Sequence, residues 1–154
     1  MRPDADTVGR AAVFAALGAG DRTALATCFH GRAYAPGEAA FREGDPAASL
    51  LLVGEGSFLA VVRAGGIPRE VGRFGPGDIV GASSLVDRGR RRHSLIAVGP
   101  AVAYEIDADA VALLRPTAPV AARALVTASL RALIHRLRRL EQRVESSLDR
   151  SGAA

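Results

Sequence analysis

Three features of this sequence of 154 residues predict an α+β fold that is mainly β. Turns rich in glycine and proline recur through residues 36–77, and short apolar segments such as residues 49–53 and 58–62 lie between them. Helical patterns occupy both ends of the sequence. Short segments with turns at this spacing are typical of antiparallel strands in a sandwich or barrel. We therefore predict a β-structure that is flanked by helices.

The N-terminal residues predict two short helices. Apolar side chains recur at helical spacing over residues 7–17, and Gly18-Ala19-Gly20 ends this pattern. A second helix is expected to begin at Asp21, a favourable N-cap residue, and to run to about residue 29. Residues 1–6 are predicted to be disordered.

Residues 73–98 combine the features of an anion-binding site. Glycines crowd around the start of this segment, and after Gly81 the small residues Ala82, Ser83 and Ser84 begin a short helical turn. Backbone N–H groups that are exposed at such a helix end attract anions. The arginine run of residues 88–92 follows, and residues 93–98 alternate like a strand. A guanidinium is a bidentate and permanently charged partner for phosphate.

Within this run we predict that Arg92 dominates anion binding and that Arg91 and His93 lie at the edge of the site. The alternative is a solvated basic turn between two strands, which would bind no ligand.

The same segment resembles the phosphate-binding cassette of the cyclic nucleotide-binding domain. That family includes the catabolite activator protein, protein kinase A regulatory subunits and cyclic-nucleotide-gated channels. Its pattern is Gly-Asp, two apolar residues, Gly-Glu, a small helical turn and, after a loop, Arg-(Ser/Thr)-Ala. The matching stretches here are Gly77-Asp78-Ile79-Val80-Gly81-Ala82-Ser83-Ser84-Leu85 and Arg92-His93-Ser94.

The resemblance extends beyond the cassette. Residues 34–38, 41–46 and 51–56 are similar to strand and turn motifs of the family. It implies a double-stranded β-helix, a jelly-roll-like β-roll, over residues 7–118. It also implies that a nucleotide phosphate contacts the cassette residues Gly81, Ala82, Ser83, Ser84, Arg91, Arg92 and His93.

Two departures from the family pattern bear on the ligand. Ala82 stands where the family has a Glu that bonds the ribose 2′-hydroxyl, which argues against cyclic AMP. Arg136 and Leu137 fall where the catabolite activator protein places hydroxyl residues against adenine. An arginine there suits a guanine edge or a second phosphate. A cyclic nucleotide or a cyclic dinucleotide is therefore the expected ligand, and an empty pocket is the alternative.

After the cassette, residues 101–106 predict a last strand, and Asp107 or Asp109 is expected to cap a helix that reaches Leu114. Pro119 suits the first turn of a final helix over residues 119–148, followed by a tail of residues 149–154.

The final helix carries a heptad pattern, which predicts a parallel homodimer through a coiled coil. The predicted dimer seam consists of Val126, Leu130, Leu133, Leu137, Leu140 and Val144. The alternative is a helix that packs wholly on its own domain.

In the transcription-factor branch of the family, this helix leads to a helix-turn-helix domain. The sequence ends at Ala154, so we expect an isolated sensor domain that does not bind DNA directly. The helix arginines are expected to form a solvated face; they are Arg131, Arg138, Arg139 and Arg143.

Composition argues against several other classes. The single cysteine, Cys28, supplies no disulfide framework and no iron–sulfur site, and no cofactor is predicted. The histidines, His30, His93 and His135, lie in separate predicted elements without a catalytic constellation, so we do not expect an enzyme. No apolar run is long enough for a membrane span, and the N-terminus lacks a signal peptide, which predicts a cytoplasmic protein.

These observations leave two hypotheses. The first is a non-enzymatic regulatory sensor that binds a phosphate-bearing nucleotide and signals through a dimeric C-terminal helix to an unknown effector protein. The second is a ligand-free β-roll that serves as a scaffold or interaction protein.

Overall fold

The computed structural model describes residues 1–152 and has the mainly β, α+β architecture that the sequence predicts. Within these residues the strands form two four-stranded sheets and one two-stranded sheet, all antiparallel. The first sheet has the order β1 (His30–Tyr34), β10 (Ala101–Asp107), β4 (Ser49–Glu55), β7 (Ile79–Val80). The second has the order β2 (Ala39–Phe41), β9 (Ser94–Ala97), β5 (Phe58–Ala64), β6 (Ile67–Phe74). The third pairs β3 (Pro46–Ala47) with β8 (Gly89–Arg90).

Strand β4 shows why the first sheet is buried on both faces. Its apolar residues are consecutive, and successive side chains of a strand point to opposite faces. Leu51 and Val53 lie in the core between the two four-stranded sheets. Leu50 and Leu52 belong to a second core beneath the helices. An uninterrupted apolar strand is therefore what this position requires.

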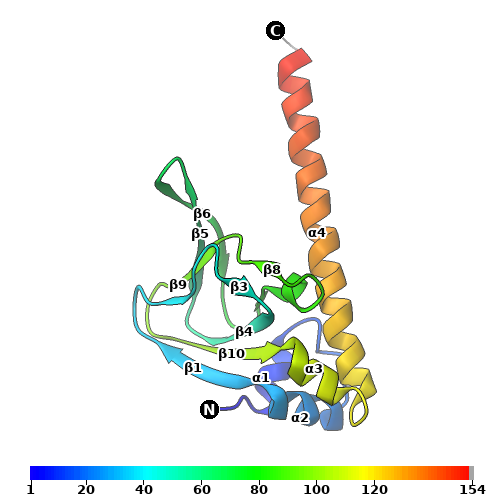
Figure 1. Cartoon of the computed structure of the whole chain (residues 1–154). Helices are drawn as coiled ribbons and strands as arrows, with labels where there is room; N and C mark the ends of the chain where they lie inside the picture. Colours follow the sequence, from blue (N-terminus) through cyan, green and yellow to red (C-terminus); the bar gives the residue numbers. More distant parts are fainter. Residues whose placement is uncertain (153–154) are drawn as a thin grey trace.

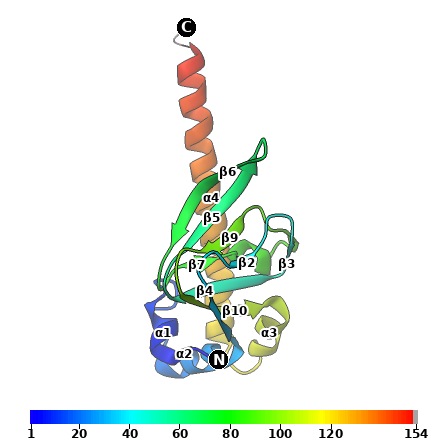
Figure 2. The ribbon, with the colours of Figure 1, turned by 90° about the vertical axis from the view of Figure 1, so that its left-hand side faces the viewer.

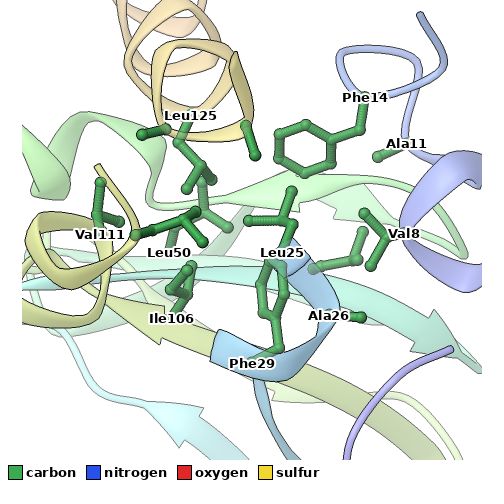
Figure 3. Packing of buried hydrophobic residues seen from close by; sticks show 14 of the residues in the cluster. Val8, Ala11, Phe14, Leu25, Ala26, Phe29, Leu50, Ile106, Val111 and Leu125 are labelled. Atoms are coloured by element: carbon green, nitrogen blue, oxygen red, sulfur yellow. The ribbon is translucent and has the colours of Figure 1, made fainter. Parts of the chain in front are cut away.

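The helices close the second core at one end of the β-roll. Figure 3 shows Leu25 and Leu125 converging on Leu50 and Ile106, with Phe14 beside them. All five side chains are buried. Removing such a side chain from water contributes about 1.5–3 kcal/mol. This contact fixes the start of the last helix against the roll.

The first helix is shorter than predicted. Helix α1 (Ala5–Arg10) gives way to successive turns, in which the N–H groups of Ala11, Phe14 and Leu17 each donate to the carbonyl three residues earlier. Because these turns advance by three residues, they bury the same apolar side chains that a helix over residues 7–17 would bury. The predicted helix over residues 7–17 is therefore wrong beyond Arg10, although the apolar residues that suggested it are packed in the core.

Two further N-terminal predictions differ from the structure. Helix α2 (Ala19–Cys28) has Gly18 at its N-cap, and Asp21 lies in its first turn instead, where a carboxylate interacts favourably with the helix dipole. Residues 1–6, predicted to be disordered, make defined contacts. The Asp4 side chain accepts a hydrogen bond from the Thr7 N–H at 2.7 Å and caps α1.

The C-terminal helices follow the sequence prediction closely. Helix α3 (Ala108–Leu114) has Asp107 at its N-cap, where the carboxylate accepts from the Ala110 N–H at 2.7 Å. Asp109 pairs with Arg88 instead of capping. Helix α4 (Pro119–Gly152) begins at the predicted proline and continues past residue 148 into the predicted tail. Residues 153–154 of that tail lie outside the described part of the chain.

Helix α4 extends well beyond the β-roll (Figure 1). Its first turns pack on α2 and α3, and its C-terminal half projects from the same side of the β-roll as the β5–β6 hairpin, which leans away from it (Figure 2). Among the described residues, no helix is both long and apolar enough to cross a bilayer.

Candidate functional site

The predicted glycine-rich cassette folds as a strand, a turn and a single helical turn. Strand β7 ends at Val80, and Gly81 adopts a left-handed conformation with φ 76°. The 3-10 helix η1 (Ala82–Leu85) follows, and its first internal hydrogen bond runs from the Ser84 N–H to the Gly81 carbonyl at 2.9 Å. The N–H groups of Ala82 and Ser83 precede that bond. The cassette therefore presents backbone donors next to Gly81.

After η1 the chain forms strand β8, which pairs with β3, and Arg91 follows directly with its side chain in the interior. The Arg91 carbonyl accepts from the Gly44 N–H, and the Arg91 N–H donates to the Asp45 carbonyl, both at 2.8 Å. Its side chain is only 7% exposed. Strand β9 begins three residues later and continues the same alternation, with Leu95 and Ala97 buried.

The Arg91 guanidinium is held by neutral groups. Nη2 donates to Ser49 Oγ at 2.8 Å, and Nη1 donates to the Ser49 carbonyl at 3.1 Å. Ser84 Oγ is 3.5 Å from Nη1, and the guanidinium carbon lies 4.0 Å from the centre of the Phe41 ring. Ser49 Oγ in turn donates to the Glu105 carboxylate. The serine hydroxyl is thereby oriented to accept from Arg91.

Charge balance at Arg91 is incomplete. Among the described residues, no carboxylate lies within ion-pair distance of this guanidinium, and its Nε is buried without a hydrogen-bond partner. Burial lowers the pKa of Arg91, and the more distant Glu105 and Asp45 carboxylates offset this effect in part. Because arginine stays protonated even when buried, the described part of the protein holds an enclosed cation with no carboxylate in direct contact.

Two adjoining cavities open around the cassette. The inner one, of about 110 Å³, lies against Ser84, Arg91 and Phe41. The outer one, of about 430 Å³, extends between β5, β6 and α4. They share lining residues, which are Gly81, Ser83, Arg92, His93 and Leu133. Ligand sites commonly have about 300–1,000 Å³, so the inner cavity suits one group of a ligand and the outer cavity suits its body.

The structure brings the predicted cassette residues together, but the inner position is taken by Arg91 and the edge position by Arg92. Arg91, expected at the edge, is the buried cation, whereas Arg92 is exposed and lines both cavities from their rim. His93 also lines both cavities and lies 5.6 Å from Phe41 between ring centres. Ala82 is 5% exposed, belongs to the core beneath the helices and borders the outer cavity.

Leu137, one of the two residues predicted to cap the ligand from the last helix, is not brought to this site. Leu137 is exposed and borders neither cavity. The side chain of Arg136 lies outside the described part of the structure. Instead, Leu140, Arg139 and Arg143 border the outer cavity.

The predicted dimer seam is largely uncovered in the single chain. Its exposed members are Val126, Leu130, Leu137, Leu140 and Val144. Leu133 is half-buried because it faces the cassette. Leu133 and Leu140 therefore belong both to the predicted seam and to the cavity walls.

Sequence reasoning missed the groups that surround Arg91. Ser49, Phe41 and Glu105 come from strands far from the cassette in sequence, and no local motif marks them. Among the described residues, no cluster of histidine, cysteine and carboxylate side chains has an arrangement that would hold a metal ion.

Gly81 lies where the structure has no room for a side chain. A Cβ added there would lie 2.4 Å from Arg91 Nη1 and 3.1 Å from the Ser49 carbonyl oxygen. The left-handed backbone adds a cost of about 1–2 kcal/mol for any other residue. We expect Gly81→Ala to lower the free energy of unfolding by at least that amount in urea denaturation.

Gly75→Ala is the matched control, since a Cβ at that position meets no atom within 4 Å and its φ is not positive. Equal stability of the two variants would contradict the role assigned to Gly81.

Comparisons with known proteins agree with this geometry. A family model described as "Cyclic nucleotide-binding domain" matches residues 31–131. No curated protein sequence shows significant similarity to the chain.

Solved structures provide further matches. The N-terminal domain of a transcriptional regulator from Streptomyces coelicolor is 27% identical, with a TM-score of 0.74, over 90% of this chain and 95% of that chain. The catabolite activator protein of Thermus thermophilus is 29% identical, with a TM-score of 0.73, over 86% of this chain and 61% of that chain. A cyclic nucleotide-binding domain from Methylobacillus flagellatus is 21% identical, with a TM-score of 0.77, over 94% of this chain and 82% of that chain.

Proposed function

The chain belongs to the cyclic nucleotide-binding domain family, and from that membership we propose that it is a regulatory sensor whose Arg91 binds the phosphate of a nucleotide. Domains of this family are typically regulatory and not catalytic. The single observation that supports the ligand is the buried Arg91 guanidinium, which has no carboxylate within ion-pair distance among the residues that the structure describes. An anion in the inner cavity would supply the missing charge and accept hydrogen bonds from Arg91.

The neighbouring groups support the same assignment. The N–H groups at the start of η1 and the Ser84 hydroxyl adjoin the cavity that Arg91 lines. Arg92 stands at the rim, where it would contact the same phosphate from the solvent side. In this proposal Arg91 contacts the phosphate from inside the cavity, and Arg92 contacts it from the solvent side.

The proposed output is a parallel homodimer that communicates with an effector protein through α4. Leu133 and Leu140 support this link, because each borders a cavity and also lies in the predicted dimer seam. A ligand that contacts these two side chains would affect the position of α4 relative to the roll, and with it the seam.

One observation favours a second function, that of a ligand-free scaffold. Ala82 occupies the position of the family Glu and is packed among core residues. A ribose hydroxyl would find no carboxylate there. The two functions differ in a measurable way, because a ligand at 100 times its Kd raises the stability of the folded state by about 2.7 kcal/mol.

The proposed function is tested by calorimetry with cyclic AMP, cyclic GMP and cyclic di-GMP on the unaltered protein and on Ala82→Glu. We expect at least one nucleotide to bind the unaltered protein, and cyclic AMP to bind weakly. A carboxylate at position 82, which borders the outer cavity, is expected to strengthen cyclic mononucleotide binding by about tenfold or more.

Two results would count against this account. Failure of every nucleotide to bind the unaltered protein would favour the scaffold. Micromolar cyclic AMP binding that Ala82→Glu leaves unchanged would mean that position 82 does not face the ribose.

A further inference from the structure

The outer cavity has an uneven distribution of charge. On the side of the β-sheets its wall is apolar, with Val62, Val71 and Phe74 among the lining residues. On the side of α4 it is bordered by Arg139 and Arg143, and Arg92 stands where the two cavities meet. Among the side chains that the structure describes, no carboxylate borders this outer cavity.

The two helix arginines, Arg139 and Arg143, border the same cavity from neighbouring turns of α4. They are four residues apart, so they lie on the same face of α4, one turn from each other. In the described part of the chain, neither is within ion-pair distance of a carboxylate. Arg92, Arg139 and Arg143 are exposed, and together they concentrate positive charge around a partly apolar cavity.

Arg138 has a different position on the same helix. Successive residues of an α-helix are about 100° apart around its axis, so Arg138 points away from the face that Arg139 and Arg143 share. It is exposed and borders neither cavity. Arg131, Arg138, Arg139 and Arg143 are all exposed, as the sequence predicts, and Arg139 and Arg143 also adjoin the outer cavity.

We propose that Arg139 and Arg143 form a second anion subsite, and that the ligand of this protein is a nucleotide with two separate phosphate groups. This inference rests on the proposed function, because one phosphate is assigned to Arg91 in the inner cavity. The second phosphate lies at Arg139 and Arg143, with Arg92 between the two. The apolar wall of β5 and β6 covers the base or sugar that joins them.

The proposal accounts for the size of the site as well as its charge. A phosphate in the inner cavity of about 110 Å³ leaves the outer cavity of about 430 Å³ for the rest of the ligand. A ligand with one phosphate would leave two helix arginines without an anion beside that cavity. Cyclic dinucleotides and linear nucleotides with phosphates at both ends share the required chemistry.

The experiment compares three probes by calorimetry at equal ionic strength: cyclic GMP, cyclic di-GMP and the linear guanosine 3′,5′-bis(diphosphate). Each is titrated into the unaltered protein, Arg139→Gln, Arg143→Gln and the control Arg138→Gln. We expect at least one doubly phosphorylated probe to bind the unaltered protein about tenfold or more tightly than cyclic GMP. Arg139→Gln and Arg143→Gln are each expected to weaken that probe by about fivefold to tenfold, and Arg138→Gln by less than about twofold.

The outcomes separate this inference from the proposed function. If cyclic GMP binds as tightly as both doubly phosphorylated probes, or if Arg138→Gln matches the other two variants, the second subsite is wrong while the phosphate site at Arg91 stands. If no probe binds the unaltered protein, the proposed function fails and the second subsite fails with it. If only the linear probe depends on Arg139 and Arg143, the subsite stands and its ligand is linear.

Discussion

Leu137→Arg is expected to convert the proposed homodimer into a monomer. Leu137 is 57% exposed in the single chain, between the equally uncovered Leu130 and Val144. In a parallel coiled coil each seam residue faces its own copy, so the substitution would bring two buried charges together. Burying an unpaired charge costs several kcal/mol, which is enough to separate the chains at micromolar concentration. Light scattering coupled to size-exclusion chromatography measures the result.

Leu113→Arg is the matched control for this prediction. Leu113 is 77% exposed on α3 and lies outside the heptad pattern. The control is expected to keep the mass of the unaltered protein. A monomeric unaltered protein at tens of micromolar, or a dimer that survives Leu137→Arg, would contradict the proposed seam.

Arg91→Met is expected to separate ligand binding from folding. Loss of a charge-assisted contact in a partly closed site should weaken nucleotide binding by about ten- to a hundredfold. The same substitution removes a buried cation without a carboxylate partner and leaves a flexible thioether against Phe41. The hydrogen bonds to Ser49 that are lost oppose the gain from removing the buried cation, so the free energy of unfolding of the ligand-free protein should change little. Calorimetry and urea denaturation measure the two effects on one variant.

The control is Arg92→Met, at the exposed neighbour. It is expected to weaken binding less than Arg91→Met does. A larger loss of affinity in Arg92→Met than in Arg91→Met would support the sequence-based prediction that Arg92 dominates phosphate binding. A clear loss of stability in Arg91→Met would mean that this arginine serves mainly the fold.

The burial of Arg91 and the exposure of Arg92 are features that motif counting alone did not predict. Residues 90–92 are all arginine, so residue type does not distinguish them. Matching the family motif without a gap selects the last of the three. The strand pattern indicates a different arginine. The side chains of β9 alternate between the two faces of the sheet, and Leu95 and Ala97 are the buried ones. Continuing this alternation backwards points Arg91 inwards and Arg92 outwards. The signal was present in the apolar pattern that follows the run.

Other parts of the fold were predictable because their signals are local. The Asp107 cap, the proline at the start of α4 and the consecutive apolar residues of β4 each act within a few residues. The groups around Arg91 were not predictable in this way. Ser49 lies on β4 and bonds Arg91, and the pairing of β4 with β10 brings Glu105 to Ser49. A site that is built from several strands leaves little trace in any one of them.

The most direct test of the phosphate site is the ¹⁵N–¹H NMR spectrum of the arginine guanidinium groups during a nucleotide titration, with the Arg91 signal assigned by its absence in Arg91→Met. The buried Nε–H of Arg91 should give a signal that is protected from solvent exchange. We expect this signal to move in a saturable way, in step with the calorimetric binding curve, as the phosphate contacts the guanidinium. A nucleotide that binds while the Arg91 signal stays in place would contradict the assignment of Arg91 as the phosphate ligand.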